Sequence, residues 1–199
     1  MSTIHIIAGP PGIGKSTRGP DYISPSLDIL NEDDMRRKYK DKGFLDYNEY
    51  SIYRVRDIIR QKLIRNDDFA LELNLGFSHQ YEYAISAKQF GSNNQLHIIL
   101  FYSDSLQLCL DRAKARYEHG LHLVEPETVT QMFNNTIPLF KENFNAIDNL
   151  ILVNADTQNK FSLVAVYNKN TELLNIFDAS PNWFKDQIKP FIESQIRTL

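Results

Sequence analysis

The segment Gly9-Pro10-Pro11-Gly12-Ile13-Gly14-Lys15-Ser16 decides how the rest of this sequence is interpreted. It fits the pattern G-x-x-x-x-G-K-[ST] at every defined position. It directly follows the apolar run Ile4–Ala8, which is typical of a buried parallel strand that leads into a loop. Phosphate binding requires this context, which therefore favours a phosphate-binding loop (P-loop) over a merely flexible glycine-rich turn.

The residue types in the loop suit a nucleoside triphosphate and its metal ion. Glycines let the backbone curl so that successive N–H groups point at phosphate oxygens, and the start of the next helix adds its positive end. Lys15 would reach the β- and γ-phosphates, and the Ser16 hydroxyl would ligate Mg²⁺. We therefore predict a site for ATP (with GTP as the alternative) and Mg²⁺. Its nucleotide-binding residues would be Gly9, Pro10, Pro11, Gly12, Ile13, Gly14, Lys15, Ser16 and Thr17.

The surroundings of the loop give two further expectations. Gly19-Pro20 follows Ser16 closely, and proline removes a helix hydrogen bond, so the helix after the loop should be short or kinked. Lys15 lies at the junction of loop and helix, and we expect its side chain to lie outside the core.

Composition limits the class of protein. The chain has 199 residues, 42% apolar and 24% charged, which suits one soluble α/β domain. The net charge of −3 is spread along the chain, so no nucleic-acid or membrane partner is expected. The single cysteine, Cys109, excludes a disulfide framework and a cysteine-built metal site, and we expect it to be buried on a helix. No apolar run approaches the roughly 18 residues of a membrane span and no signal peptide is evident, which favours a cytoplasmic location.

Strands alternate with helices along most of the chain. Apolar runs predict strands at residues 4–8, 69–75, 96–102 and 150–153, and helical spacing predicts helices at 31–39, 47–65, 78–90, 105–119 and 126–140. This alternation predicts a three-layer α/β fold of the P-loop NTPase and kinase type, with a mostly parallel sheet, over residues 1–156. Residues 157–199 should form a β-hairpin (161–167 with 171–177) and a helix from Pro181 to about Arg197, packed on the same domain.

Three classes of P-loop protein compete. A GTPase needs a guanine-reading motif such as N-K-x-D, and the nearest match, Asn168-Lys169-Asn170-Thr171, lacks the aspartate. An ATPase motor usually has an apolar strand that ends in two acids, and no predicted strand does so. A small-molecule kinase needs an acid near the acceptor hydroxyl and a lid helix with arginines. Arg112 and Arg116 lie one helical turn apart and would suit a lid; alternatively they form a solvated face, paired with Asp111 and Glu118.

Several separate blocks of sequence agree in spacing with a known family. They are Ala8–Thr17, Asn31–Asp34 with Arg36 following, Glu72 before Gly76-Phe77-Ser78, and Arg112-Ala-Lys-Ala-Arg116 continuing through Gly120-Leu-His122-Leu-Val124. From Ile4 to about Asn154 the chain thereby resembles the zeta-toxin-like P-loop kinases, especially the branch described as predicted ABC-type ATPases. The resemblance implies ATP-dependent phosphorylation of a small hydroxyl substrate. Toxin members phosphorylate the sugar 3′-hydroxyl of UDP-N-acetylglucosamine and are restrained by an antitoxin, which implies a nucleotide sugar as acceptor and an antitoxin-like partner here.

By position, the resemblance also implies roles for individual residues. Asp33 would be the catalytic base for the acceptor hydroxyl, with Lys15 on the phosphates and with Arg112 and Arg116 as lid cations. The residues implied to contact the substrate are Glu72, Arg36 and His122. Asp33 could instead complement the helix dipole, as its acidic neighbours can, and His122 could simply order the loop after the lid helix. Glu72 is predicted in the middle of an apolar strand, where an unpaired charge is costly to bury, and this favours a site role.

The chain departs from the family pattern at several points. Glu72-Leu-Asn replaces a Glu-Thr-Thr-like strand end, Leu121 replaces a glycine, and Gln131 and Met132 stand where arginines are expected. Losing a cation on the phosphates would cost about 3 kcal/mol of transition-state stabilisation, by analogy with one oxyanion donor. Arg54 and Arg56 are candidate substitutes. The alternative function is a nucleotide-binding or ATPase module without efficient phosphoryl transfer, which acts through a protein partner.

Overall fold

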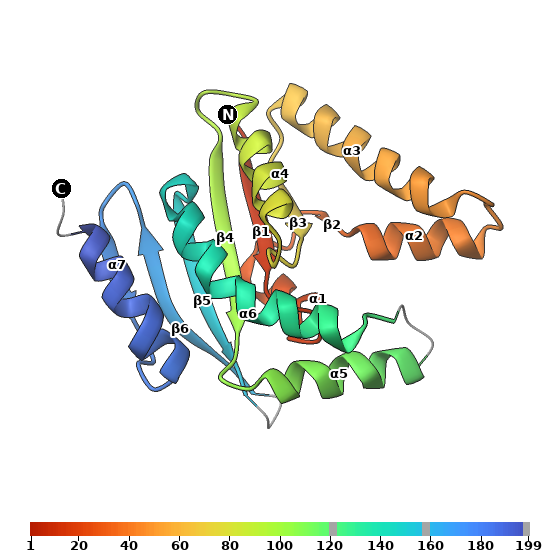
Figure 1. Cartoon of the computed structure of the whole chain (residues 1–199). Helices are drawn as coiled ribbons and strands as arrows, with labels where there is room; N and C mark the ends of the chain where they lie inside the picture. The colour runs from red at the N-terminus through yellow and green to blue at the C-terminus, as the bar shows by residue number, and fades with distance from the viewer. Residues whose placement is uncertain (120–122, 157–159, 197–199) are drawn as a thin grey trace.

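The computed structural model describes residues 1–119, 123–156 and 160–196 and is built around one seven-stranded sheet (Figure 1). The strand order is β2-β3-β1-β4-β5-β6-β7. The strands from β2 to β5 in this order run parallel, whereas β6 is antiparallel to β5 and β7 to β6. The predicted α/β fold with a mostly parallel sheet is thus confirmed. The strands are β1 (Thr3–Ala8), β2 (Ile29–Leu30), β3 (Phe69–Glu72), β4 (Gln95–Tyr102), β5 (Asn149–Ala155), β6 (Phe161–Asn168) and β7 (Leu173–Ile176).

The helices follow the predicted order closely. The short helix expected after the P-loop is present, because α1 has only 4 residues and passes into a 3₁₀ turn at Gly19–Tyr22. Asn31 caps α2 as expected, since its side-chain oxygen accepts a hydrogen bond from the Asp33 backbone N–H at 2.8 Å. The helices are α1 (Lys15–Arg18), α2 (Glu32–Asp41), α3 (Tyr47–Arg65), α4 (Ser78–Gln89), α5 (Leu106–Glu118), α6 (Pro126–Asn143) and α7 (Lys189–Ile196), the last preceded by a π-helical turn at Trp183–Ile188.

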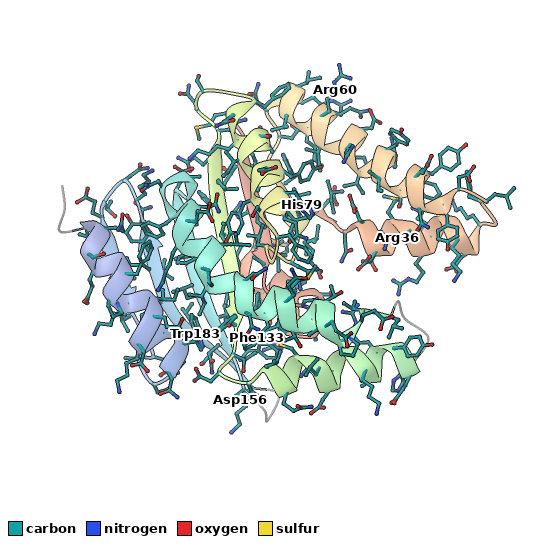
Figure 2. The ribbon with its side chains drawn as sticks, viewed as in Figure 1. Arg36, Arg60, His79, Phe133, Asp156 and Trp183 are labelled. Carbon is teal, nitrogen blue, oxygen red and sulfur yellow. The ribbon has the colours of Figure 1, made fainter. Side chains whose placement is uncertain are left out.

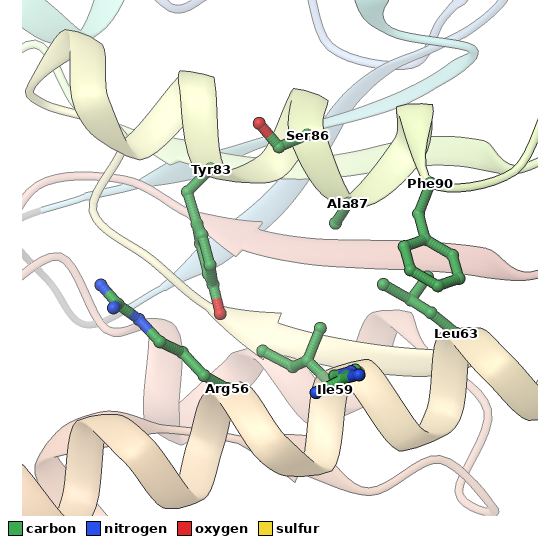
Figure 3. Close-up of a pocket in the computed structure, with 8 residues that line it drawn as sticks. Arg56, Ile59, Leu63, Tyr83, Ser86, Ala87 and Phe90 are labelled. Atoms are coloured by element: carbon green, nitrogen blue, oxygen red, sulfur yellow. The ribbon is translucent and has the colours of Figure 1, made fainter.

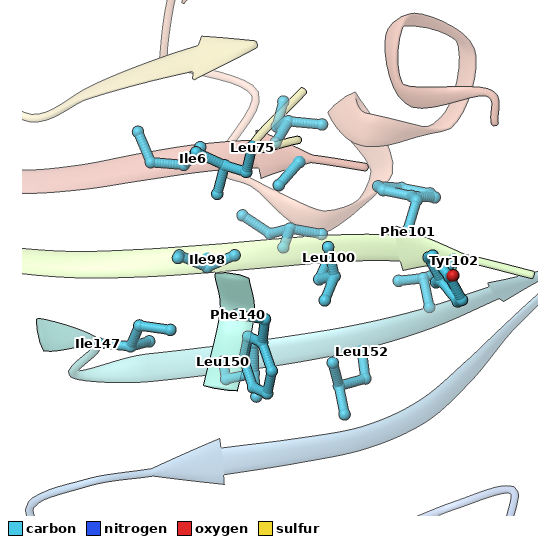
Figure 4. Packing of buried hydrophobic residues seen from close by; sticks show 14 of the residues in the cluster. Ile6, Leu75, Ile98, Leu100, Phe101, Tyr102, Phe140, Ile147, Leu150 and Leu152 are labelled. Carbon is cyan, nitrogen blue, oxygen red and sulfur yellow. The ribbon is translucent and has the colours of Figure 1, made fainter. Parts of the chain in front are cut away.

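The central strands owe their place to their apolar sequence. β1 lies between β3 and β4 and is buried on both faces, which is why Ile4–Ala8 is nearly all apolar. One face packs against α4 and α6, and Figure 4 shows Phe140 of α6 beside Leu150 of β5. On the other face Tyr22, in the turn after α1, meets Phe101 at 5.6 Å between ring centroids. Helices α2 and α3 form a hairpin at the β2 edge of the sheet (Figure 1).

The C-terminal segment continues the same sheet. β6 pairs along the whole length of β5, and the π-helical turn is fastened by the Asp104 carboxylate, which accepts hydrogen bonds from two backbone N–H groups. The ring centroid of Trp183 lies 5.6 Å from that of Tyr102, and Tyr102 stacks on Phe133 of α6 at 4.7 Å. Figure 2 labels Trp183 and Phe133. The C-terminal helical segment and the inner strand β6 therefore contribute buried residues to the core, whereas β7 forms an exposed edge. Within the described residues no helix is both long and apolar enough to cross a membrane.

One strand boundary differs from the prediction in a way that affects the site. The apolar run at residues 69–75 predicts Glu72 in mid-strand, but β3 ends at Glu72. The chain remains beside β1 as far as Asn74, whose carbonyl accepts a hydrogen bond from the Gly9 N–H, and Leu75 then turns away with a positive φ of 52°. Glu72 therefore stands at the carboxyl end of its strand, where parallel sheets of this type bind ligands.

Candidate active site

Glycines fix the path of the P-loop. Gly9 and Gly12 have φ values of 138° and 79°, which side-chain-bearing residues rarely adopt. A Cβ on either would lie 2.3 Å from a backbone oxygen, that of Phe101 at Gly9 and that of Cys109 at Gly12. Because β4 and α5 approach so closely, the loop is held between them. Cys109 is buried on α5, as predicted.

The side chain of Lys15 is enclosed by its own loop. Its ammonium donates hydrogen bonds to the Gly9 carbonyl at 2.8 Å, the Pro10 carbonyl at 3.1 Å and the Asn74 side-chain oxygen at 2.8 Å. These bonds use all three ammonium protons. Lys15 lies outside the hydrophobic core, as expected, but it is nevertheless buried, because the residue is only 6% exposed. Burial lowers its pKa from 10.5 to about 8, although the nearby Glu72 carboxylate favours the charged form.

Ser16 is joined to the neighbouring strand. Its hydroxyl donates a hydrogen bond of 2.9 Å to the Glu72 carboxylate. The parallel pairing of β1 with β3 places Ile7 opposite Glu72, so the acid lies just where the loop leaves β1. Sequence reasoning gave Glu72 a substrate role and did not find this contact, since it depends on which strand lies next to β1.

An acidic hollow of about 120 Å³ opens beside the loop. It brings together three of the predicted site residues, Lys15, Asp33 and Glu72, from the ends of different elements. The remaining lining comes from the start of α2, the chain after β3 and α4: Asn31, Glu32, Leu73, Asn74 and Gln80. The hollow has the place and the charge expected of an acceptor site.

Two adjacent aspartates at the start of α2 make similar ion pairs but differ in position. Asp33 accepts a hydrogen bond of 2.6 Å from Arg36, and Asp34 accepts one of 2.9 Å from Arg37. Only Asp33 lines the hollow. Arg36, labelled in Figure 2, is therefore placed to hold the Asp33 carboxylate rather than to reach the hollow directly.

The two predicted lid arginines occupy different environments. The Arg112 guanidinium donates to the carbonyl of Ile13 in the loop at 3.1 Å and to that of Asp156, after β5, at 3.3 Å. Arg116 makes no hydrogen bond or ion pair with any residue in the described ranges, but its charge helps to lower the pKa of Lys15. The alternative pairing is not observed, because Asp111 accepts from Gln107 and Glu118 faces Lys114. Arg112 thus holds the loop, whereas Arg116 is an exposed cation whose charge acts on Lys15.

Phe161, at the start of β6, belongs to the site and was not predicted. A Cβ on Gly14 would lie 2.6 Å from its ring. The guanidinium groups of Arg18 and Arg112 each lie 5.7 Å from the ring centroid, within the range of cation–π attraction. The aromatic ring thereby covers the outer side of the P-loop. No local pattern reveals this, because the hairpin reaches the loop only by adding to the sheet beside β5.

Three other predicted positions have separate outcomes. His122 lies outside the described residues. Gln131 is exposed, and Met132 is buried against Gly76, where an added Cβ would lie 2.5 Å from the Met132 Cβ. Of the two positions at which the family pattern has arginines, the first is therefore exposed to solvent and the second packs in the interior.

The residues present fit a magnesium ion bound mainly through phosphate and water. No group of three or more His, Cys, Asp or Glu side chains in the described part of the chain could hold a metal ion alone. Mg²⁺ does not need such a cage, because it commonly uses one or two protein oxygens together with substrate phosphates. The Ser16 hydroxyl and the Glu72 carboxylate supply oxygens of this kind side by side.

Comparison with known proteins supports the fold. The sequence matches no family model and no curated protein. The AvrRxo1-ORF1:AvrRxo1-ORF2 structure with sulphate ions has a TM-score of 0.67 at 13% identity, covering 94% of this chain and 63% of that chain. The structure of the same complex with ATP has a TM-score of 0.65 at 13% identity, and the coverage of both chains is the same. A structure of the PezAT chromosomal toxin–antitoxin system of Streptococcus pneumoniae has a TM-score of 0.61 at 13% identity. The match covers 98% of this chain and 84% of that chain.

These likenesses confirm the α/β fold, which this chain shares with the AvrRxo1-ORF1:AvrRxo1-ORF2 and PezAT structures. The present chain spans about 63% of the length of the AvrRxo1-ORF1 structures that it matches.

Proposed function

We propose that this chain is an ATP-dependent phosphotransferase that acts on a hydroxyl group of a small molecule. The observation that carries the proposal is that Lys15, Asp33 and Glu72 line one hollow together. A P-loop alone would serve an ATPase or a switch equally well. A second carboxylate, held beside the loop by its own arginine, is what an acceptor hydroxyl needs.

The reaction assigns a distinct task to each residue. The loop N–H groups and Lys15 bind the phosphates, and the acceptor oxygen attacks the γ-phosphorus. The bond from that phosphorus to the β–γ bridging oxygen breaks, and ADP leaves with the bonding electrons. Asp33 takes the hydroxyl proton, while Arg116 neutralises charge on the transferring group.

Magnesium would be held by the Ser16 hydroxyl and by Glu72, in addition to the phosphates. When bound, it would screen the negative charge of the phosphate oxygens. Binding of ATP is supported by the fold, since an AvrRxo1-ORF1:-ORF2 structure of the same architecture was solved with ATP.

A nucleotide-binding module that acts through a protein partner is the second candidate. It is favoured by Gln131 and Met132, which provide no cation where the family pattern has two. The PezAT structure comes from a toxin–antitoxin system and the AvrRxo1 structure is that of ORF1 with ORF2, which also supports an antitoxin-like partner for this chain under either function.

ADP release separates the two candidates. Purified protein is incubated with ATP, Mg²⁺ and a panel of nucleosides and nucleotide sugars, and ADP and phosphorylated acceptor are measured together. We expect one class of acceptor to stimulate ADP release in the wild type but not in Lys15→Ala. ATP binding by calorimetry without stimulation by any acceptor would reject the phosphotransferase and leave the binding module.

A further inference from the structure

We infer that the groove between α3 and α4 is a second binding site, which takes a small anion bearing one compact apolar ring (Figure 3). The groove lies apart from the P-loop and shares no lining residue with the acidic hollow. Its polar side chains are Arg56, Arg60 and Tyr83, together with Ser86. The buried hydroxyl of Tyr83 has a property that the free protein leaves unexplained, and the two arginines are exposed.

The Tyr83 hydroxyl is buried and has no hydrogen-bond partner among the described residues. A buried hydroxyl without a partner destabilises a protein, so its retention calls for a cause. Figure 3 shows the hydroxyl pointing across the groove from α4 toward α3, between Arg56 and Ile59. Burial and the nearby Glu32 carboxylate raise the pKa of Tyr83, although Arg56 opposes them, so the hydroxyl keeps its proton and can donate it to an anion.

Arg56 and Arg60 supply unpaired positive charge one helical turn apart on α3. Neither makes a hydrogen bond or an ion pair with any residue that the structure describes, whereas Arg54 on the same helix pairs with Asp57 at 2.9 Å. A guanidinium presents a planar fork of donors that matches a carboxylate or a phosphate. Arg56 and the tyrosine therefore favour an anionic group at this end of the groove, and Arg60 adds positive charge one turn further along α3.

The rest of the groove is apolar. Ile59, Leu63 and Ala87 form a buried floor, and the Phe90 ring stands beside them with 54% of its surface exposed. The volume is about 190 Å³. Sites for whole drug-sized ligands usually occupy roughly 300–1,000 Å³, so this groove suits a single ring and not a complete nucleotide.

The groove adjoins the acidic hollow. Gln80 of α4 lines the hollow, and Tyr83 lines the groove one helical turn further along the same helix. Glu32 also lines the hollow and lies close enough to Tyr83 to affect its pKa. A molecule whose hydroxyl reaches Asp33 can therefore place a ring and an anionic group in the groove. This assignment of the ligand as the acceptor rests on the proposed function; the existence of the site does not.

Binding is tested directly with phenyl phosphate, and benzyl alcohol serves as the neutral comparison. Amide chemical shifts are followed by NMR without ATP, in wild type and in Lys15→Ala. We expect phenyl phosphate to shift residues 56–63 and 83–90 in both proteins, and benzyl alcohol to bind at least about tenfold more weakly. Shifts confined to residues 9–17 would mean that the probe binds only the P-loop, and this would overturn the inference.

Matched variants test the individual groups. Tyr83→Phe should weaken phenyl phosphate binding about fivefold, as for one lost hydrogen bond, without lowering the Tm of the free protein. Arg56→Gln and Arg60→Gln should each weaken it about tenfold, and Arg54→Gln should leave it unchanged. Equal binding by all four variants would overturn the site. Groove binding that persists in a protein with no phosphotransferase activity would keep the site and reject only its assignment to the acceptor.

Discussion

The Ser16 hydroxyl donates a hydrogen bond of 2.9 Å to the Glu72 carboxylate, and this contact joins the P-loop to the strand beside β1. The hydroxyl hydrogen points at the acid, so the oxygen lone pairs of Ser16 are available to a cation. A strand that ends in one acid, rather than the pair typical of ATPase motors, would therefore suit the magnesium ion that the proposed function requires.

Replacement of Glu72 by glutamine should raise the magnesium requirement. The amide keeps the shape but removes the charge next to Ser16, and loss of a partner to a metal ligand typically costs about 10–100-fold in metal affinity or activity. We expect the Mg²⁺ concentration for half-maximal ADP release to rise about tenfold or more in Glu72→Gln. Glu82→Gln, an exposed change on α4, is the control. An unchanged magnesium dependence would mean that Glu72 does not help to bind magnesium, and its role would then be limited to contact with the acceptor.

Lys15→Ala should abolish ATP binding and turnover while the circular dichroism spectrum is retained. The loop itself encloses the ammonium group, and the backbone path is fixed independently by Gly9 and Gly12. Lys114→Ala, an exposed change on α5, should have no effect. Calorimetry that gives wild-type ATP affinity for Lys15→Ala would contradict the assignment of the loop.

ATP affinity should also fall as the pH rises through about 8, the lowered pKa of Lys15. The ammonium form binds phosphate, and it is fully present below this pKa and is lost above it. Above about 8 we expect the affinity to fall by at most tenfold per pH unit, which is measurable by calorimetry. Lys15→Arg keeps its charge at every accessible pH, so its affinity should vary less in the same range. Identical pH profiles for the two proteins would show that another group titrates.

Asp33→Asn and Asp34→Asn form a matched pair for the catalytic base. Both carboxylates lie in the first turn of α2 and each pairs with an arginine three residues later, but only Asp33 lines the hollow. Asp33→Asn should reduce phosphoryl transfer by roughly 10²–10⁴-fold with nearly unchanged ATP affinity, and Asp34→Asn should be close to wild type. If Asp34→Asn is the damaging change and Asp33→Asn is close to wild type, the catalytic base is Asp34.

Phe161→Ala should weaken ATP binding by about tenfold, because the ring packs on Gly14 and two guanidinium groups face it. Phe177→Ala removes an exposed ring from the same C-terminal segment and serves as the control. Affinity is measured by calorimetry at fixed Mg²⁺. Equal affinities in the two variants would mean that the hairpin does not support the loop.

Local features of this chain could be predicted from its sequence. The P-loop, the Asn31 cap and the full span of α3 each depend on residues close together in the chain, and the structure places them as expected. The parallel sheet followed from the alternation of strands and helices. The end of β3 could not be predicted, because the apolar pattern continues to Leu75 while the backbone turns away there.

Long-range features of the site could not be predicted. The contact of Ser16 with Glu72 requires that β3 lie next to β1, and the approach of Phe161 to Gly14 requires that the hairpin add to β5. The burial of Lys15 arises because carbonyls of its own loop and Asn74 surround it. Such contacts depend on the order of strands in space, which spacing along the chain does not encode.

The two arginines of α5 provide the last prediction, since the structure gives them different surroundings. Arg112 holds the carbonyls of Ile13 and Asp156, so Arg112→Ala should mainly raise KM for ATP. Arg116 lies near Lys15 without a fixed partner among the described residues, so Arg116→Ala should mainly lower kcat, by about 10²-fold, the size of one lost oxyanion-type donor.

A double-mutant cycle at Arg112 and Arg116, read out as ADP production and separately as ATP binding, distinguishes the possible arrangements. If the tasks are separate, the two losses should add within about 0.5 kcal/mol. Equal effects on kcat that add to much less than their sum would instead mean that both cations surround one phosphoryl group as a unit. Lys114→Ala on the same helix controls for general disturbance of α5.

If the wild type turns over no faster than Lys15→Ala with every acceptor, yet binds ATP, neither arrangement applies. The chain is then a nucleotide-binding module, as the uncharged side chains of Gln131 and Met132 would suggest.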